Sequence, residues 1–405
     1  MTLLRTSARP EAQLLIACAR TTVDSHSAAR IKSLLRSEID WSYLLEKAHQ
    51  NFTAPLLYWN LQRTCPEAVP KQVLDQLRDY FRGHTQYNLA LTGELLKLLR
   101  LFEAHDIKAL PFKGPTLAAL VYDNLSLRQF SDLDILVRKQ DVLRAKALLT
   151  SHGYRLAIPL TWVQHTAPHL SRKYNFCFYS SNGKVTVQLH WRLSGKHFAF
   201  PLDMCGLWER LEPVQIVGSA IPSLPPKDLL LYLCMHGSRH SWERLGWICD
   251  IAELVRLYPA VDWKQIIEQA GTMGIRRELA LGLYLANEVL EADLPEDTLR
   301  TIQSDRVVTS LAAQVREWLF RDANASLSIS NWYRYHLSVK ERSRDKMRLR
   351  LHYYLRYLSI AIKPNEKDRQ FLLLPPFLSF FYYLLRPIRL VKEYGLNPLK
   401  NINNL

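Results

Sequence analysis

The sequence lacks the features of a disulfide framework, a zinc ribbon or a membrane span. No two cysteines form a Cys-x-x-Cys pair, and all six are far apart in the 405 residues, at positions 18, 65, 177, 205, 234 and 249. This scatter is typical of reduced thiols in an intracellular protein. No window reaches the roughly 18 uninterrupted apolar residues of a membrane span, since the nearest, 371–385, contains Pro375-Pro376. The apolar run 14–19 is too short for a secretory signal. We therefore expect a cytoplasmic protein.

Acidic residues are also in deficit. The chain has 53 Lys and Arg against 38 Asp and Glu, which gives a formal net charge of +15. About half of this excess lies in 334–369, where eleven basic residues accompany four acids. A hydrophobic content of 48% allows a buried core and excludes disorder of the whole chain. The basic balance permits an anionic partner, such as a nucleotide, RNA or a lipid headgroup, without selecting one.

The pattern of apolar and polar residues divides the sequence into four regions. Residues 11–95 have helical periodicity interrupted by prolines, and a strongly amphipathic helix is predicted over 89–105. Short strands then alternate with helices, and after Pro225-Pro226 the pattern is helical again. We predict an N-terminal helical region (1–95), a mixed core (96–225), a helical domain (226–320) and a basic, aromatic C-terminal region (321–405).

The mixed region has clear turn signals. A strand over 107–112 is followed by Lys113-Gly114-Pro115 and a helix to Tyr122, with proline in the first turn where its missing N–H costs nothing. A second strand is predicted over 133–137 and a helix over 140–152. Asn182-Gly183 joins two alternating runs, 174–179 and 184–193, as a hairpin. Further helices are predicted over 227–237, 245–257, 263–271 and 276–290.

Asp132 and Asp134 are the most informative pair. At positions i and i+2 of a strand their carboxylates point to one face, while Leu133 points into the core. Two carboxylates held this close repel each other unless a cation or a shared proton lies between them. Paired acids suit Mg²⁺, which usually also binds substrate phosphates. Upstream, Gly114 opens a helix whose backbone N–H groups can bind phosphate, and Lys113 adds positive charge there.

This arrangement resembles the nucleotidyltransferase superfamily with the polymerase-beta-like fold. It is most similar to an uncharacterised bacterial branch that has Lys-Gly where the superfamily usually has Gly-Ser. The resemblance extends over about 95–395, through Arg128 and the segments 189–193 (LHWRL), 236–242 (HGSRHSW), 245–250 (LGWICD) and 386–387 (RP). It implies an α+β fold, with a polymerase-beta-like core containing a small mixed sheet, flanked by N- and C-terminal helical regions.

The resemblance also implies a reaction: Mg²⁺-dependent transfer of a nucleotidyl group from a nucleoside triphosphate to an unknown acceptor, such as a sugar, a peptide or a small phosphorylated metabolite. Asp132 and Asp134 would hold the metal. Lys113 and the Gly114 backbone would bind the triphosphate, and Arg128 would neutralise charge that develops on the phosphoryl oxygens. Chemistry of this kind depends on positioning and electrostatics.

One position departs from the superfamily pattern. A third carboxylate is usual on a later strand, but the matching strand, 185–191, has Gln188 there, beside His190 on the same face. Either His190 acts as the base, since its ordinary pKa is near 6.5, or Asp203 or Asp250 completes the site. The alternative is a catalytically degenerate nucleotide- or RNA-binding module, in which Gln188 contributes to binding.

Other residues have competing interpretations. His236 and His240 are spaced as zinc ligands, but hydrogen bonding or nucleotide phosphate contact is favoured over metal. Trp191, Trp242 and Trp247 are expected in the core, with base stacking by one of them as the alternative. The basic tail is interpreted as a solvated face, a binding surface for RNA or another polyanion, or a contact with an anionic membrane surface. For its aromatic stretch 377–383, packing on the core is preferred.

Overall fold

The computed structural model describes residues 9–157, 174–195, 198, 200–320, 329–362, 364, 366–372 and 375–394. The chain divides into two compact units, unit 1 (Met1–Asp322) and unit 2 (Ala323–Leu405). The elements of unit 1 are α2 Pro10–Cys18, α3 Ser25–Leu34, α4 Trp41–Gln50, α5 Ala54–Thr64, η1 Pro66–Ala68, α6 Lys71–Glu103, β1 Ala109–Pro111, α7 Pro115–Tyr122, β2 Asp132–Val137, η2 Lys139–Asp141, α8 Val142–Ser151, β3 Arg155–Leu156, β4 Asn175–Tyr179, β5 Thr186–His190, α10 Met204–Leu207, β6 Glu212–Ile216, β7 Ser219–Ser223, α11 Pro226–Arg239, α12 Leu245–Leu257, α13 Trp263–Met273, α14 Arg276–Leu290, α15 Glu296–Gln303 and α16 Arg306–Leu319.

Several helices of unit 1 begin directly after an aspartate that caps their first turn. Asp24, Asp40, Asp262 and Asp305 each accept a hydrogen bond from a backbone N–H of the first turn that follows, in α3, α4, α13 and α16. A carboxylate at this position satisfies a donor that the helix leaves unpaired and interacts favourably with the helix dipole. The sequence therefore fixes these helix starts locally, before any tertiary packing.

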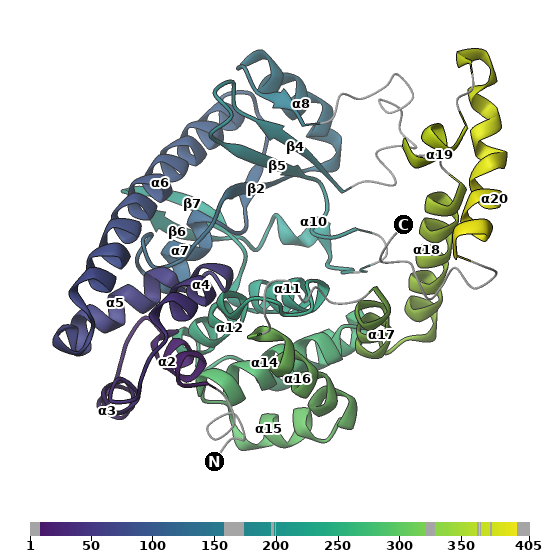
Figure 1. Cartoon of the computed structure of the whole chain (residues 1–405). Helices are drawn as coiled ribbons and strands as arrows, with labels where there is room; N and C mark the ends of the chain where they lie inside the picture. Colours follow the sequence, from purple (N-terminus) through teal and green to yellow (C-terminus); the bar gives the residue numbers. More distant parts are fainter. Residues whose placement is uncertain are drawn as a thin grey trace. The chain divides into compact units, whose positions relative to one another are not determined.

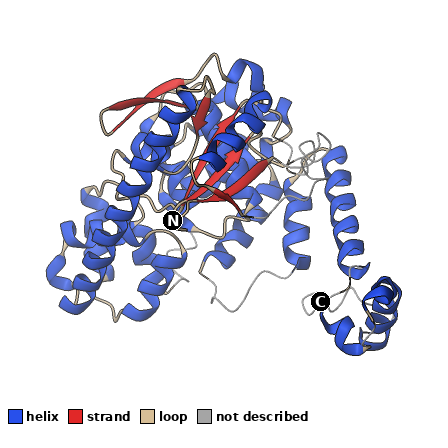
Figure 2. Cartoon of the chain, turned by 90° about the horizontal axis from the view of Figure 1, so that it is seen from above, coloured by secondary structure: helices blue, strands red, loops and turns tan. Residues whose placement is uncertain are grey.

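The central sheet has five strands in the order β1-β2-β5-β4-β3. β2 and β5 run parallel, with Asp134 opposite Gln188, while the other neighbouring pairs are antiparallel. Figure 2 shows these strands in red among the helices. The β4–β5 pair is the predicted hairpin, and Gly183 in its turn has a φ of 69°, a left-handed conformation that glycine adopts without strain. The predicted mixed sheet and the α+β class are confirmed.

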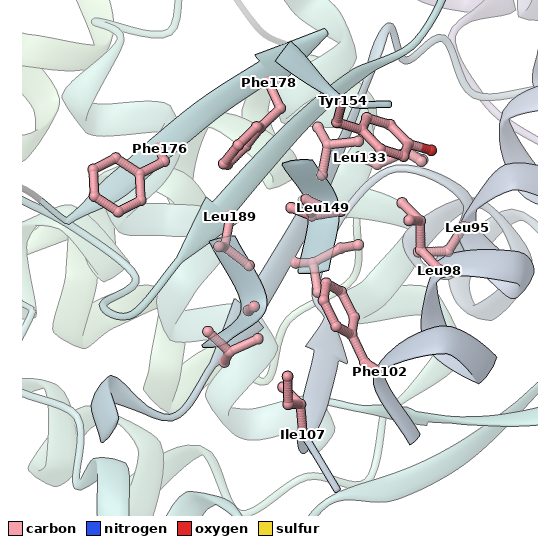
Figure 3. Packing of buried hydrophobic residues seen from close by; sticks show 14 of the residues in the cluster. Leu95, Leu98, Phe102, Ile107, Leu133, Leu149, Tyr154, Phe176, Phe178 and Leu189 are labelled. Atoms are coloured by element: carbon pink, nitrogen blue, oxygen red, sulfur yellow. The ribbon is translucent and has the colours of Figure 1, made fainter. Parts of the chain in front are cut away.

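One face of this sheet forms the apolar core. Leu133, Ile135, Val187 and Leu189 from the two parallel strands are almost fully buried, and they belong to one cluster with side chains of α6 and α8. Figure 3 shows Leu95, Leu98 and Phe102 of α6 and Leu149 of α8 packed around them, together with Phe176 and Phe178 of β4. Because strand side chains alternate, the opposite face of β2 and β5 presents the polar residues between these positions.

A layer of helices faces the polar side of the sheet (Figure 1). α11 and α12 pack against each other and both contact α14, which in turn contacts α16. Figure 1 shows α11 and α12 below the sheet, with α14 beneath them. The close approach within this layer requires glycine, because a Cβ at Gly237 of α11 would collide with the ring of Trp242, which is fully buried.

The predicted elements of the mixed region are present, with several boundary errors. The helix predicted over 89–105 is only the end of α6, which begins at Lys71, and the first strand is limited to Ala109–Pro111. Residues 139–141 form a 3₁₀ turn, so α8 starts later than expected. The β6–β7 hairpin was not predicted. Its turn places Val217 at a φ of 48°, a conformation that valine rarely adopts and that sequence patterns therefore do not signal.

Unit 2 contains helices whose elements are α17 Ile329–Val339, α18 Ser343–Ile362, α19 Glu366–Phe371, η4 Pro376–Phe381 and α20 Tyr382–Tyr394. Asp368 of α19 is fully buried and accepts hydrogen bonds from Arg386 and Arg389 of α20, at 2.7 and 2.6 Å. In the aromatic stretch Tyr382 is buried, but Phe380, Phe381 and Tyr383 are exposed, so the expected packing on a core holds only in part. Across both units, no helix in the described ranges combines the length and the apolar character needed to cross a bilayer.

Candidate functional site

The polar face of β2 and β5 carries four of the predicted site residues. Asp132 and Asp134 alternate with the buried Leu133, and on the neighbouring strand Gln188 and His190 share their face. The parallel register places Gln188 opposite Asp134. The Gln188 side-chain amide donates to the neighbouring acid, Asp132, at Oδ2 over 3.3 Å. The strand period that was inferred from the sequence therefore brings these side chains together at one edge of the core.

Lys113 and Gly114 lie in the turn between β1 and α7. Gly114 has a φ of 58° and a ψ of −127°, and a Cβ on it would lie 3.2 Å from the backbone oxygen of Asp132. An L-residue there would be strained and crowded, so glycine allows the turn to pass close to the strand that bears the acids. Pro115 then begins the helix. The Lys113 side chain extends across to Asp134, with Nζ 2.8 Å from Oδ2.

Asp134 is the centre of a buried polar network. Its side chain is 4% exposed, and its second oxygen, Oδ1, lies 2.8 Å from His190 Nε2. Burial alone would raise the pKa of Asp134, but the Lys113 ammonium and the hydrogen bond from His190 lower it well below the usual range. Burial likewise opposes the charge of Lys113, yet Asp134 raises the pKa of this lysine. Both groups are therefore charged at neutral pH.

Asp132 has a different electrostatic environment on the same strand. Its pKa is raised, first by burial and then by the negative charge of Asp134, and Lys113 and the Gln188 hydrogen bond only partly offset this. Gln188 is itself oriented by Asn175 of β4, whose amide donates to Gln188 Oε1. Two carboxylates thus share one lysine, which leaves an excess of negative charge at this edge.

A second ion pair lies in the same cleft. Arg128 donates from Nε and Nη2 to the two oxygens of Asp250 on α12, at 2.8 and 2.9 Å, and the Tyr122 hydroxyl donates to Asp250 Oδ1 at 2.8 Å. The loop that carries Arg128 is held from behind by α6, where the buried Asn88 donates to the carbonyl oxygens of Leu125 and Arg128. Arg128 is therefore committed to Asp250 and not directed at the acids of β2.

The opposite wall of the cleft comes from α11, α12 and the turn between them. His236 and His240 lie with ring centroids 4.7 Å apart, and Trp247 contacts both rings. Burial, and then nearby cations that include Arg239 and Lys113, lower the pKa of His240 to about 3, and the pKa of His236 is also well below its usual value. Both imidazoles are therefore neutral at neutral pH.

Together these residues line one open cleft with a volume of about 390 Å³. Every site residue predicted from the sequence lines it: Lys113, Gly114, Arg128, Asp132, Asp134, Gln188, His190, His236 and His240. Of the two alternative acids, Asp250 lines the cleft but is paired with Arg128, and Asp203 instead caps α10 through the backbone N–H groups of Cys205 and Gly206.

Sequence reasoning missed several residues of the lining. Tyr174, Tyr232 and Arg239 are part of it, and Trp247, which was expected in the core, is only partly buried and faces the cleft. Trp191 and Trp242 are buried as predicted. A signal for Tyr232 and Arg239 did exist, because their spacing around His236 on one helix places Tyr232, His236 and Arg239 on the same face.

The acids of β2 are suited to a hard cation. Within the described ranges no group of three or more His, Cys, Asp or Glu residues is arranged to hold a metal by itself. Mg²⁺ commonly binds through one or two carboxylates and completes its coordination with water and substrate phosphates. Asp132 and Asp134 supply such a pair, and the ammonium of Lys113 already lies where they attract positive charge.

Comparison with known proteins agrees with this geometry. Residues 37–291 match a family described as uncharacterised nucleotidyltransferase, a span that includes the whole cleft. No curated protein and no solved structure matches the chain significantly. Since the match covers more than half of the chain, the protein belongs to the uncharacterised nucleotidyltransferase family.

Proposed function

We propose that this protein transfers a nucleotidyl group from a nucleoside triphosphate to an acceptor, and that the sheet with its bound helices is a polymerase-beta-like catalytic core. The observation that carries the proposal is the placement of Asp132 and Asp134 on one face of β2, in the same cleft as the Lys113-Gly114 turn. The acceptor class stays open among a sugar, a peptide and a small phosphorylated metabolite.

Each residue has a role that follows from its contacts. Asp132 and Asp134 would hold Mg²⁺, which when bound neutralises and orients the triphosphate. Lys113 and the backbone N–H groups after Gly114 would bind phosphate oxygens, because the turn opens α7 beside the acids. His190 would position Asp134 through the 2.8 Å contact of its Nε2. Its other ring nitrogen, Nδ1, is buried and has no hydrogen-bond partner in the described part of the chain, so Asp134 is the group to which the ring is bonded.

Arg128 has a supporting role in this proposal. Its bidentate contact with Asp250 holds the loop of residues 123–131, which leads directly into Asp132. The earlier expectation that Arg128 neutralises phosphoryl charge would require it to leave Asp250, and the geometry favours the structural role. Arg128 and Asp250 therefore fix where β2 begins.

Label transfer tests the proposal. The wild-type protein is incubated with each of four nucleoside triphosphates, labelled at the α-phosphate, together with Mg²⁺ and cell extract, and the products are separated. We expect label on an acceptor with the wild type and none with Asp132→Asn/Asp134→Asn. Transfer that survives the double substitution rules out the assignment of the acids, provided that both proteins show the same thermal unfolding transition.

A second candidate function is nucleotide binding without transfer. Gln188 occupies the position opposite Asp134 where the superfamily usually has a third acid, and its amide is bonded to Asp132. An amide cannot accept a proton from an attacking hydroxyl, which favours a binding module. In that case the wild type binds nucleoside triphosphate with Mg²⁺ in calorimetry, yet no label reaches any acceptor, and Gln188→Glu is the variant in which transfer would appear.

A further inference from the structure

The chain contains a long segment without any carboxylate. Between Asp141 and Asp203 the sequence has no Asp or Glu, but it has eight basic residues, Arg144, Lys146, Arg155, Arg172, Lys173, Lys184, Arg192 and Lys196. This segment includes β3, β4 and β5 and supplies Tyr174, Asn175, Gln188, His190 and Leu193 to the lining of the cleft. One side of the cleft is therefore built from a part of the chain that cannot neutralise a cation.

Arg239, at the end of α11, lies against this segment. Its Nη2 donates to the Tyr174 hydroxyl at 2.6 Å, and its guanidinium lies 5.3 Å from the ring centroid of Tyr174 and 5.7 Å from that of Phe198. These contacts orient the guanidinium without neutralising it, because a phenol and two rings carry no formal charge. Only one of the five N–H donors of the fork is used by Tyr174.

The other cations of the cleft have acids close by. Lys113 contacts Asp134, Arg128 is paired with Asp250, and Arg244, which lies over the ring of Phe52, follows Glu243 directly in the chain and interacts with it. Arg239 is the cation in this lining for which the described part of the chain provides no carboxylate partner. A guanidinium in a partly enclosed cleft attracts an anion when no protein acid satisfies it.

Arg239 and Lys113 line the same cleft, and Tyr232 of α11 is also part of its lining. Both cations lower the pKa of the Tyr232 hydroxyl, which burial and Asp134 raise to about 12, so both lie near this hydroxyl. His236, one turn further along α11, is kept neutral by burial and by the charges of Lys113, Arg239 and Arg128. Arg239 thus adds to this cleft a positive charge that the acids of the described residues do not pair with.

We propose that Arg239, oriented by Tyr174, forms a phosphoryl-binding subsite in the cleft, separate from the Lys113-Gly114 turn. The inference rests on the proposed function for the identity of the ligand, and the chemistry recognised is a phosphoryl group. Two sources have this chemistry: the distal phosphates of the nucleoside triphosphate and a phosphate on the acceptor. Because Arg239 lines the same cleft as the Lys113-Gly114 turn that would bind the triphosphate, the distal phosphates are favoured.

Binding of inorganic tripolyphosphate tests the subsite without any transfer. Calorimetry in the absence of metal compares the wild type with Arg239→Gln, Arg239→Lys and Tyr174→Phe. We expect Arg239→Gln to weaken binding at least tenfold, since a charge-assisted hydrogen bond to phosphate is lost. Arg239→Lys should recover part of the affinity, and Tyr174→Phe should weaken binding to a smaller extent. Arg300→Gln, an equal charge loss at an exposed position of α15, is the matched control.

Two further titrations separate the sources of the phosphoryl group. If the subsite binds distal phosphates, Arg239→Gln weakens ATP and tripolyphosphate together and leaves AMP unchanged. If it binds the acceptor, ATP affinity is unchanged and inorganic phosphate still binds to the wild type at saturating non-hydrolysable ATP analogue, but not to Arg239→Gln. Both results support the subsite. Equal affinities of Arg239→Gln and Arg300→Gln for tripolyphosphate and for phosphate would overturn it.

The outcome is independent of the proposed reaction. Loss of tripolyphosphate affinity in Arg239→Gln, with no label transfer by the wild type, keeps the subsite and removes the transfer. Label transfer by the wild type, with unchanged affinities in Arg239→Gln, keeps the transfer and removes the subsite. Circular dichroism and the thermal transition of each variant establish that the protein is folded, and Arg239→Lys provides a charged variant should Arg239→Gln unfold.

Discussion

Two regions of the cleft each pair a buried carboxylate with a cation and one more donor, yet they differ in balance. In the brace, defined here as Tyr122, Arg128 and Asp250, one acid meets one guanidinium through two hydrogen bonds. At the strand edge, defined here as Lys113, Asp132 and Asp134, the lysine makes a single contact with Asp134, and Asp132 is a second acid on the same face. The brace is satisfied by protein groups alone, and the edge has one negative charge more than its lysine can neutralise.

This difference separates structure from function. In a closed bidentate pair the two charges already neutralise each other, so an added cation is not needed there. An edge whose second acid has a raised pKa is less stable without an added cation, as expected of a site prepared for one. We therefore expect substitutions in the brace to reduce stability, and substitutions at the edge to reduce activity with little loss of stability.

Asp132→Asn is the sharpest test of the edge. Transfer should fall about a thousandfold, equivalent to about 4 kcal/mol, because one of two carboxylates that hold the cation loses its charge. The free energy of unfolding should stay level or rise at neutral pH, since a raised pKa means that the charged form of Asp132 is disfavoured in the folded protein. Single-turnover kinetics and urea unfolding measure the two effects, with the exposed Asp293→Asn as control. Retention of transfer within tenfold contradicts the assignment.

Asp250→Asn tests the brace. It leaves the Arg128 guanidinium, whose side chain is 12% exposed, without its counter-charge, so the free energy of unfolding should fall by about 3 kcal/mol. The double variant Arg128→Met/Asp250→Leu should recover most of that loss, because no unpaired charge remains. Urea denaturation measures both. A loss below about 1 kcal/mol together with abolished transfer would instead identify Asp250 as the missing third acid.

The strand edge could be predicted from the sequence and the brace could not. Asp132 and Asp134 are separated by the buried Leu133 at the start of an apolar strand, so their spacing located them, and Gly114 was located by its residue type. Arg128 was also located, but its partner Asp250 is 122 positions away and on a helix that shows no charge pattern. Pairing across such a distance depends on how α7, the following loop and α12 pack, which periodicity does not contain.

Arg239 was missed for a related reason. Sequence reasoning looked for acids and histidines with ligand spacing, whereas Arg239 is oriented by the phenol of Tyr174 from a different element. The absence of acids between Asp141 and Asp203 was visible in the chain, but only the structure shows that this segment lines the cleft. Most helix and strand types were predicted because they follow from local patterns, while boundaries such as the start of α6 depended on packing.

Acidification distinguishes the buried histidines of the cleft, such as His240, from both ion pairs. Burial lowers the pKa of His240 to about 3 in the folded protein, against an ordinary 6.5. Below pH 6.5 the unfolded chain therefore binds a proton at this residue while the folded protein does not, and the free energy of unfolding decreases as the pH is lowered. The loss should reach about 2 kcal/mol by pH 5. Asp134, with its lowered pKa, keeps its contribution throughout this window and loses it only below about pH 4. Urea unfolding at pH 7 and pH 5 should show a larger loss of stability in the wild type than in His240→Asn, in which His236 and His84, whose pKa values burial also lowers, still contribute. Equal pH dependence of the two proteins would show that His240 is accessible to protons in the folded state.

Tyr122→Phe makes the smallest change to the brace and so defines its limits. The substitution removes one hydroxyl that donates to Asp250 Oδ1 and leaves the Arg128 fork intact, so the free energy of unfolding should fall by about 1 kcal/mol. Tyr87→Phe removes a hydroxyl that donates to a carbonyl oxygen at the exposed surface, and it should cost less because water replaces that bond. Since the brace acts only by holding the loop before Asp132, transfer by Tyr122→Phe should stay within about threefold of wild type, a change worth less than 1 kcal/mol. If transfer is lost while stability is kept, the Tyr122 hydroxyl contacts the substrate, and the brace belongs to the reacting site together with the edge.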